Sequence, residues 1–189
     1  MISLKKIFGP ILFCLPLFAA AQDESIQWTS KRLTWDDYMA KPSMDDEAAA
    51  VTSTGIGIEY QVRNSQLSYK ITCMFSKIRS WGRYKSDYIL SHEQGHFDIT
   101  EIFARKLAKE IDEYTFNPRS FKTDLNKIYK NVMKEKEDYQ DLYDRETDYS
   151  RNRTKQADWL KKISDELNEL AGWANYSSSP TFDNAILPR

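Results

Sequence analysis

The hydrophobic pattern along this chain changes from one typical of strands to one typical of helices. Residues 51–60 and 66–75 carry alternating or β-branched apolar positions, and Asn64-Ser65 between them predicts a tight turn. From about Arg83 onward, apolar residues recur every three or four positions, as on one face of a helix. Three such stripes follow: His92, His96, Ile99, Phe103, Leu107 and Ile111; Phe121, Leu125, Ile128, Val132, Tyr139 and Leu142; Trp159, Ile163, Leu167 and Leu170. Strands followed by helices predict one α+β domain, with N-terminal antiparallel strands packed on C-terminal helices.

The first residues do not fit this domain. Lys5 and Lys6 precede an apolar run over residues 7–18, and three alanines follow it. This order is typical of a secretory signal peptide, so we assign residues 1–21 to one, with a retained membrane anchor as the alternative. The run is too short to cross a bilayer comfortably, and we expect no stable membrane span after cleavage. Residues 22–172 then form the domain and residues 173–189 a loose tail, and the protein is secreted or periplasmic.

Charge and cysteine content limit the kinds of site that the domain can contain. Without residues 1–21 the chain has 25 basic and 28 acidic residues, a net charge of −3, which does not favour a nucleic-acid binder. Cys73 is then the single cysteine, so we expect neither an intramolecular disulfide nor a cysteine-based zinc cluster. Within its apolar run, Cys73 is expected to be buried and inert. Any metal ion must be held by His, Asp, Glu or Tyr.

The first helical stripe begins with His92-Glu93-Gln94-Gly95-His96, an HExxH pattern that contains the only two histidines of the chain. At about 100° per residue, His92 and His96 lie about 40° apart around a helix, so both imidazoles can reach one metal ion. Zinc lowers the pKa of its bound water toward about 7, and Glu93 can act on that water as general base. The pattern therefore predicts a Zn²⁺ site. Two buried core histidines without an ion are the alternative.

Zinc needs a third protein ligand besides the two histidines. Asp98 lies about 200° around the helix from His96, and Glu101 about 140°, so both point away from the metal. We interpret Asp98 as a supporting or helix-packing group and Glu101 as part of a solvated face. The third ligand must then come from another segment of the chain.

The segments around the HExxH pattern form further motifs. His92 to Asp98 spell HExxHFD, residues 33–38 with Pro42 spell an LxWxDF…P-like opening, and residues 143–147 with Gln156 and Trp159 fit a block written YDxxTxHG…QxxW. Residues 49–56 and Ser80-Trp81 fit as well. In these motifs the chain resembles a secreted bacterial family of unknown function that is placed among the zincin-like metallopeptidases. The resemblance covers most of the mature chain and implies a zincin-like fold with an active-site HExxH helix.

One position departs from the family pattern. The second block normally has a histidine where this chain has Tyr149, and that histidine is a candidate third zinc ligand in the family. Tyr149 can bind zinc as a phenolate, since a nearby dication lowers its pKa, or its hydroxyl can stabilise a developing oxyanion. Asp144, Glu146 and Asp148 are alternative ligands. The remaining alternatives are a degenerate site that binds zinc weakly and a tyrosine that merely caps a helix end.

These features predict a secreted zinc metallopeptidase, a hydrolase of peptide bonds. Its metal ligands are His92, His96 and Tyr149, and Glu93 and Tyr149 are its catalytic residues. The expected partner is a peptide or protein substrate, or an envelope protein. The main alternative is a catalytically degenerate zincin-fold binding module of the cell envelope, and a third is a structural adaptor built on the charged helix over residues 119–143.

Overall fold

The computed structural model describes residues 24–42 and 44–176. The predicted signal peptide, residues 1–21, and residues 177–189 of the predicted tail lie outside the described residues. The described part is a mixed α+β fold, as the pattern predicts. Its elements are β1 (Ser25–Gln27), η1 (Trp35–Asp37), β2 (Ala50–Val51), β3 (Thr54–Arg63), β4 (Gln66–Ser76), β5 (Trp81–Gly82), α1 (Asp87–Asp112), α2 (Phe121–Thr147), α3 (Arg153–Glu169) and η2 (Ala171–Trp173).

The long antiparallel hairpin of β3 and β4 confirms the two predicted strands. Asn64 and Ser65 form its turn with φ angles of 48° and 62°, the positive values that a two-residue hairpin turn requires. Alternate residues of β4, Ile71, Cys73 and Phe75, are fully buried, so one face of the hairpin belongs to the core. Cys73 is therefore buried, as predicted, and burial raises the pKa of its thiol. β1 pairs with the other edge of β4, and β2 pairs with β5 in a separate two-stranded sheet.

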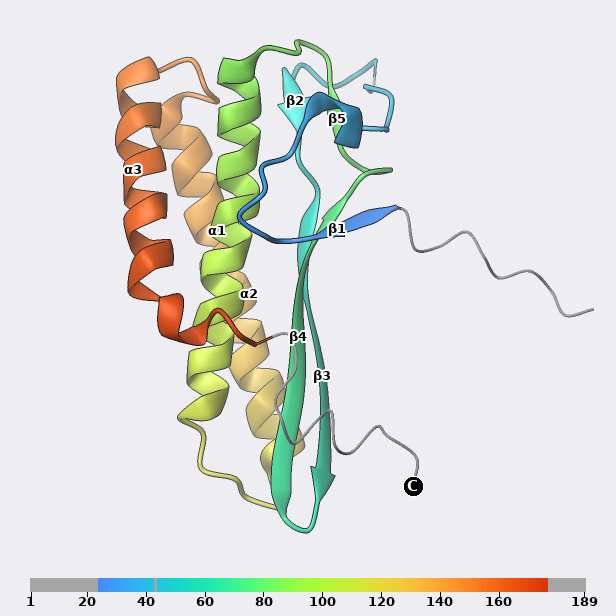
Figure 1. Cartoon of the computed structure of the whole chain (residues 1–189), viewed down its shortest axis with the longest axis vertical. Coiled ribbons are helices and arrows are strands. Elements are labelled where there is room, and N and C mark those ends of the chain that lie inside the picture. Colours follow the sequence, from blue (N-terminus) through green and yellow to red (C-terminus); the bar gives the residue numbers. More distant parts are fainter. Residues whose placement is uncertain (1–23, 43, 177–189) are drawn as a thin grey trace, which may run out of the picture.

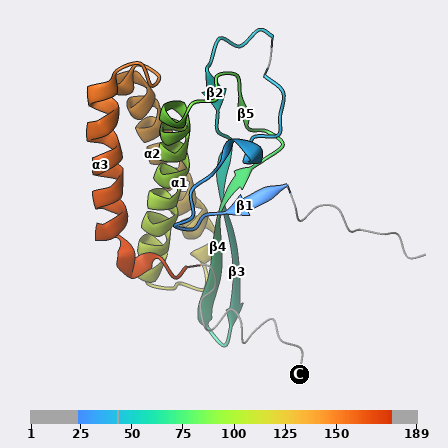
Figure 2. The ribbon, with the colours of Figure 1, turned by 45° about the horizontal axis from the view of Figure 1, so that its top comes forward.

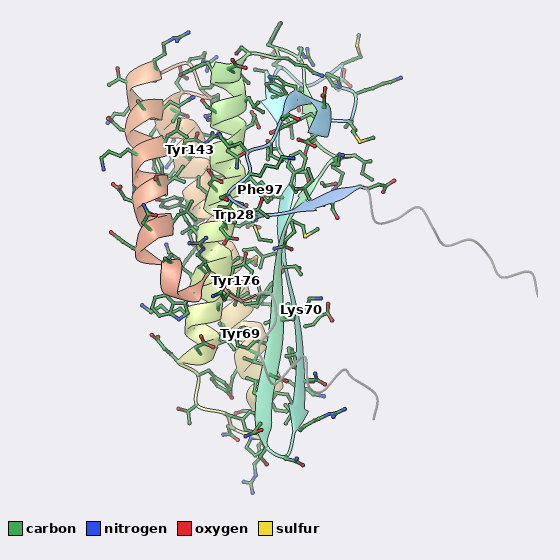
Figure 3. All side chains as sticks on the ribbon, viewed as in Figure 1. Trp28, Tyr69, Lys70, Phe97, Tyr143 and Tyr176 are labelled. Atoms are coloured by element: carbon green, nitrogen blue, oxygen red, sulfur yellow. The ribbon has the colours of Figure 1, made fainter. Side chains whose placement is uncertain are left out.

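Helix α1 lies between the hairpin and α3, and α2 crosses behind it. Figures 1 and 2 show the hairpin on one side of α1 and α3 on the other. In Figure 1 the N-terminal part of α2 lies beside the hairpin, where the Tyr129 hydroxyl donates a hydrogen bond to the Ile56 carbonyl of β3 at 2.9 Å. On the sheet side, the ring centroid of Phe97 lies 5.8 Å from that of Phe75 in β4. On the helix side, the ring of Tyr143 from α2 stacks on His92 at 4.5 Å. Figure 3 shows Phe97 and Tyr143 on opposite sides of α1, which is therefore the central element of the domain.

Local capping fixes where α1 and α3 begin. The Ser86 side chain accepts a hydrogen bond from the Ile89 backbone N–H at the start of α1, and Asn152 does the same for Lys155 at the start of α3. Such N-caps satisfy backbone donors that the first turn leaves free. Among the described residues, no helix is both long and apolar enough to cross a membrane.

The chain after α3 returns across α1 towards the hairpin (Figures 1 and 3). The carbonyl of Tyr176 accepts a hydrogen bond from the Ile71 N–H of β4 at 3.1 Å, and its hydroxyl donates to Glu101 of α1. Tyr176 is buried, so the packed part of the chain extends past the predicted tail boundary at residue 173. The assignment of Glu101 to a solvated face is wrong. Glu101 is only 1% exposed, because Arg105 and Tyr176 donate hydrogen bonds to its carboxylate within the interior.

Gly95 allows α1 and α2 to approach closely. A Cβ atom at this position would lie 2.5 Å from the hydroxyl oxygen and 2.9 Å from the Cζ of Tyr143, which is itself fully buried. Real Cβ atoms do not tolerate such distances, so any side chain at residue 95 would displace the tyrosine ring that stacks on His92. The spacing of the two helices therefore depends on this glycine.

We expect Gly95→Ala to destabilise the protein. Overpacking a close helix contact costs about 1–3 kcal/mol, which exceeds the gain of up to about 1 kcal/mol that alanine brings to a helix. Thermal unfolding of the variant measures the net effect as a lower Tm. Gly172→Ala is the matched control, since a Cβ there meets no atom within 4 Å. Equal Tm values for the two variants would contradict the close approach.

Candidate metal centre

Two antiparallel helices bring three potential metal ligands together. Helix α1 supplies His92 and His96, one turn apart, and α2 supplies Asp144. The Nε2 atoms of His92 and His96 lie 3.1 Å and 3.0 Å from the same Asp144 oxygen, Oδ1. The three groups could hold a metal ion. Asp144 is one of the alternatives that the sequence offers for the third ligand.

Gln140 and Tyr143 of α2 hold the two imidazole rings. The Gln140 side-chain oxygen accepts a hydrogen bond from Nδ1 of His96, while its Nε2 donates to the His96 carbonyl at 2.9 Å. This pair of bonds leaves Nε2 of His96 directed at Asp144. The Tyr143 ring stacks on His92 with an interplanar angle of 18°, and its hydroxyl donates to the His92 carbonyl at 3.2 Å. Supports of this kind fix ring orientation and tautomer in metal sites.

The charges of the site shift the pKa values of its members in opposite directions. Burial alone would lower the pKa of His96, but the hydrogen bond and charge of Asp144, together with the charge of Glu93, raise it to about 9. Burial would raise the pKa of Asp144, and the two histidines hold it well below its ordinary value. These shifts are those of an ion pair between protonated His96 and ionised Asp144. A metal ion that binds here must displace the proton of His96.

The site opens into a cleft of about 1030 Å³. His92, Glu93 and His96 of α1 line it together with the facing residues of α2 and with residues 46–54, which include β2. In Figures 1 and 2, α2 and β2 lie on different sides of α1. Glu93 is 4% exposed, and its Oε2 has no hydrogen-bond partner among the described residues. Buried polar atoms are normally paired, so this carboxylate oxygen is suited to a water molecule or a substrate group that enters the cleft.

Tyr149 lies at the rim of the cleft with its side chain largely exposed. Its backbone N–H donates to the Asp144 carbonyl at 2.8 Å and so helps to end α2. Asp148, Tyr149 and Ser150 have φ angles of 50°, 50° and 70°, a run of three left-handed residues. The Tyr88 hydroxyl of α1 fastens this turn through a hydrogen bond to the Ser150 carbonyl at 2.7 Å. Tyr149 as a metal ligand stays a prediction, and its position on the cleft is compatible with a contact to substrate.

The other two acidic candidates are engaged elsewhere. Glu146 accepts a hydrogen bond from the Trp159 indole of α3 at 2.8 Å, and Asp148 forms an ion pair with Arg151 at 2.8 Å. Of the three acids that the sequence offers, Asp144 is the one that the structure places beside both histidines. The Asp144 side chain therefore completes a cluster of three potential ligands, although this chain lacks the histidine that the family pattern has at residue 149.

Asp98 acts on the opposite side of α1, as its angle predicts. It accepts hydrogen bonds from the Trp28 indole at 2.9 Å and from the Gln94 side chain at 2.8 Å. The Gln94 oxygen in turn accepts a hydrogen bond from the Leu33 N–H at 2.8 Å. Figure 3 shows Trp28 beside α1, where the segment before η1 passes over the helix. Asp98 and Gln94 thus anchor the N-terminal segment to the same helix that carries the two histidines.

Gln140 is not among the site residues predicted from the sequence, and Tyr143 is predicted only as the first residue of the YDxxTxHG block. A usable signal is present, because Gln140 and Asp144 are four residues apart, like His92 and His96. When two antiparallel helices pack against each other, this equal spacing allows Asp144 to lie beside His92 and Gln140 to lie beside His96. The apolar periodicity of the second helix does not include these two polar positions, which lie on a stripe beside it.

We expect the stability of the metal-free protein to fall between pH 6 and pH 9. Because the pKa of His96 is raised to about 9, its protonation stabilises the fold fully below the unfolded value of about 6.5, and this contribution is lost as pH rises through 9. The expected loss is at most about 3 kcal/mol. Urea unfolding at a series of pH values, in the presence of EDTA, measures this loss of the free energy of unfolding. Asp144→Asn is the control, and an equally steep pH dependence in this variant would contradict the ion pair.

Comparison with known proteins places the chain in a family. A family model described as "Bacterial protein of unknown function (DUF922)" matches residues 17–151, a range that contains all of α1 and α2 and with them His92, Glu93, His96 and Asp144. No curated protein and no solved structure matches the chain. Since the match spans most of the sequence, the chain belongs to the bacterial family DUF922, whose function is unknown.

Proposed function

We propose that this protein is a zinc-dependent peptidase that hydrolyses peptide bonds in the cleft beside α1. One observation carries the proposal: ligand atoms of His92, His96 and Asp144 lie within 4.8 Å of one another, and the Glu93 that directly follows His92 is buried with an unpaired oxygen. A metal cluster and a general base are the two parts that metal-assisted hydrolysis requires.

The donor set fits zinc. Two imidazoles and one carboxylate hold zinc in catalytic sites and leave a fourth position for water or substrate. The buried Nδ1 of His92 has no partner among the described residues, whereas its Nε2 points to the cluster. The same donor set also suits iron in oxygenases. Glu93 favours hydrolysis, because a carboxylate base beside the metal serves to take a proton from water. We propose Asp144 as the third ligand.

The proposed reaction assigns a role to each residue around the cluster. Zinc, when bound, lowers the pKa of water and polarises the scissile carbonyl group. Glu93 accepts the proton of the attacking water and passes it to the leaving amine as the C–N bond breaks, so that a carboxylate product and an amine product result. Gln140 and Tyr143 keep the two imidazoles oriented. The Tyr149 hydroxyl at the rim is proposed to stabilise charge that develops on the carbonyl oxygen.

Two further features belong to this proposal. The HExxH pattern on α1, flanked by a hairpin on one side and helices on the other, supports a zincin-like assignment of the domain. The basic and apolar sequence before residue 22 supports export. We therefore propose that the peptidase acts outside the cytoplasm.

Zinc content tests the ligand assignment. We expect about one zinc ion per chain in the protein that begins at residue 22, measured by elemental mass spectrometry that also quantifies iron. Asp144→Ala should lower zinc affinity by more than the about 10–100-fold typical of supporting residues, because it removes a ligand. Tyr149→Phe is the matched comparison and should retain the ion. The reverse result, with zinc lost from Tyr149→Phe and kept by Asp144→Ala, would make Tyr149 the ligand.

Glu93→Gln tests catalysis separately from metal binding. The amide has nearly the same shape but cannot accept a proton, so we expect hydrolysis of a mixture of quenched fluorogenic peptides to fall by about 10²–10⁴-fold. Zinc content and Tm should stay at the values of the parent protein. Unchanged hydrolysis in the variant would exclude Glu93 as the base. One zinc per chain without any hydrolysis by the parent would instead favour a non-catalytic binding module.

A further inference from the structure

Carboxylates flank the cleft on both of its sides. On α2, Glu137 and Asp141 are followed by Asp144 at intervals of four and three residues, so the three side chains share the helix face that lines the cleft. Across α1, the segment that leads into β2 contributes Asp46 and Glu47 to the lining. The lining of the cleft therefore has acidic side chains in two walls, one on α2 and one in the segment before β2.

Few cations in the lining balance these acids. Lys136 and Arg151 are the basic residues that line the cleft. Arg151 forms a two-point contact with Asp148, whose carboxylate oxygens lie 3.1 Å and 2.8 Å from its guanidinium nitrogens, so its charge is compensated locally. The cleft thus keeps a negative excess even before Glu93 and Asp144 are counted.

The acidic side chains are available for a ligand. The side chains of Glu47, Glu137 and Asp141 are exposed and form no hydrogen bond or ion pair within the described residues. Glu137 interacts with Lys134 through its charge only. Asp46 accepts one backbone hydrogen bond, from Ala48 N–H at 2.8 Å through Oδ1. Carboxylates that form no ion pair at the edge of a cleft attract cations, and low-dielectric walls strengthen the attraction.

Glu93 gives an independent indication that the cleft receives a polar ligand. It lines the same cleft as these acids, it is more than nine-tenths buried, and its Oε2 has no partner among the described residues. An exposed acidic patch is ordinarily just solvated, whereas a buried and unpaired carboxylate oxygen needs an incoming donor. The acids on the walls therefore surround a site rather than a plain surface.

We propose that the cleft selects peptide segments with lysine or arginine side chains next to the bond at the metal cluster. Glu137 and Asp141 on α2, with Asp46 and Glu47 on the opposite side, would pair with the basic side chains of an extended segment. Opposite charges across an interface set specificity and the rate of encounter, and they also reject acidic segments. This inference rests on the proposed peptidase function and adds a substrate class to it.

Binding of charged model peptides tests the inference. The probes are three fluorescein-labelled peptides of equal length with the repeats Gly-Ala-Lys, Gly-Ala-Gln and Gly-Ala-Glu. They are titrated by fluorescence anisotropy against the zinc-loaded Glu93→Gln protein, which lacks the proposed base, so that binding is measured without cleavage. We expect the lysine peptide to bind at least about 10-fold more tightly than the glutamine peptide, and less so at high salt. The glutamate peptide should bind most weakly.

A matched pair of double variants separates the cleft from general charge. Glu137→Gln with Asp141→Asn should reduce the preference for the lysine peptide by about 5–10-fold, as expected for two exposed charge pairs. Asp158→Asn with Glu169→Gln changes the net charge equally at exposed positions of α3 outside the cleft and should leave the preference unchanged. An equal effect of both double variants, or no preference in the parent, would overturn the inference.

The outcomes also separate this inference from the proposed function. The lysine peptide could bind through Glu137 and Asp141 although the parent protein hydrolyses no peptide. In that case the preference for basic segments is confirmed as a binding preference, and the peptidase proposal fails. If the parent hydrolyses lysine and glutamate peptides equally well, the peptidase proposal stands and the charge preference fails.

Discussion

The close contact between α1 and α2 is the constraint on which the rest of the structure depends. At Gly95 the two helices are near enough for the Tyr143 ring to stack on His92, and the same contact sets Asp144 and Gln140 against the two histidines. A wider spacing would separate Asp144 from both imidazoles, since it contributes to the cluster only from the neighbouring helix. One small residue within the HExxH pattern thereby determines whether three ligands meet or two histidines remain alone.

Helix α1 serves two purposes with its two sides. The side toward α2 carries the histidines, and the other side uses Gln94 and Asp98 to hold the N-terminal segment through Leu33 and Trp28. Gln94 and Asp98, each two positions away from a histidine, thus fix the chain that lies over the helix. The HExxHFD pattern therefore combines a candidate metal pair with the anchor of a distant segment, which explains physically why its last residue is an acid that never faces the metal.

Much of the fold follows from sequence periodicity, because strands and helices bury side chains at different intervals. Cys73 and the Asn64-Ser65 turn could be placed from local pattern alone. Glu101 could not, because its burial depends on Tyr176, a residue that is distant in sequence and that reaches it after α3 ends. The candidate site likewise contains residues that local sequence predicts and residues that depend on distant contacts. His92 and His96 follow from one helix, whereas the choice of Asp144 over Glu146 depends on the rotation of α2 against α1, which no local spacing determines.

The turn that follows α2 stores conformational energy at the edge of the cleft. Asp148, Tyr149 and Ser150 all adopt the left-handed region, at a cost of roughly 1 kcal/mol or more for each residue with a side chain. The contact from Tyr88 to Ser150 and the N–H of Tyr149 on the Asp144 carbonyl offset this cost. Local opening of the domain is therefore expected to begin at this turn, where it relieves strain. Because the same opening frees the last turn of α2, any ligand that fixes Asp144 also suppresses fraying at this end of the helix.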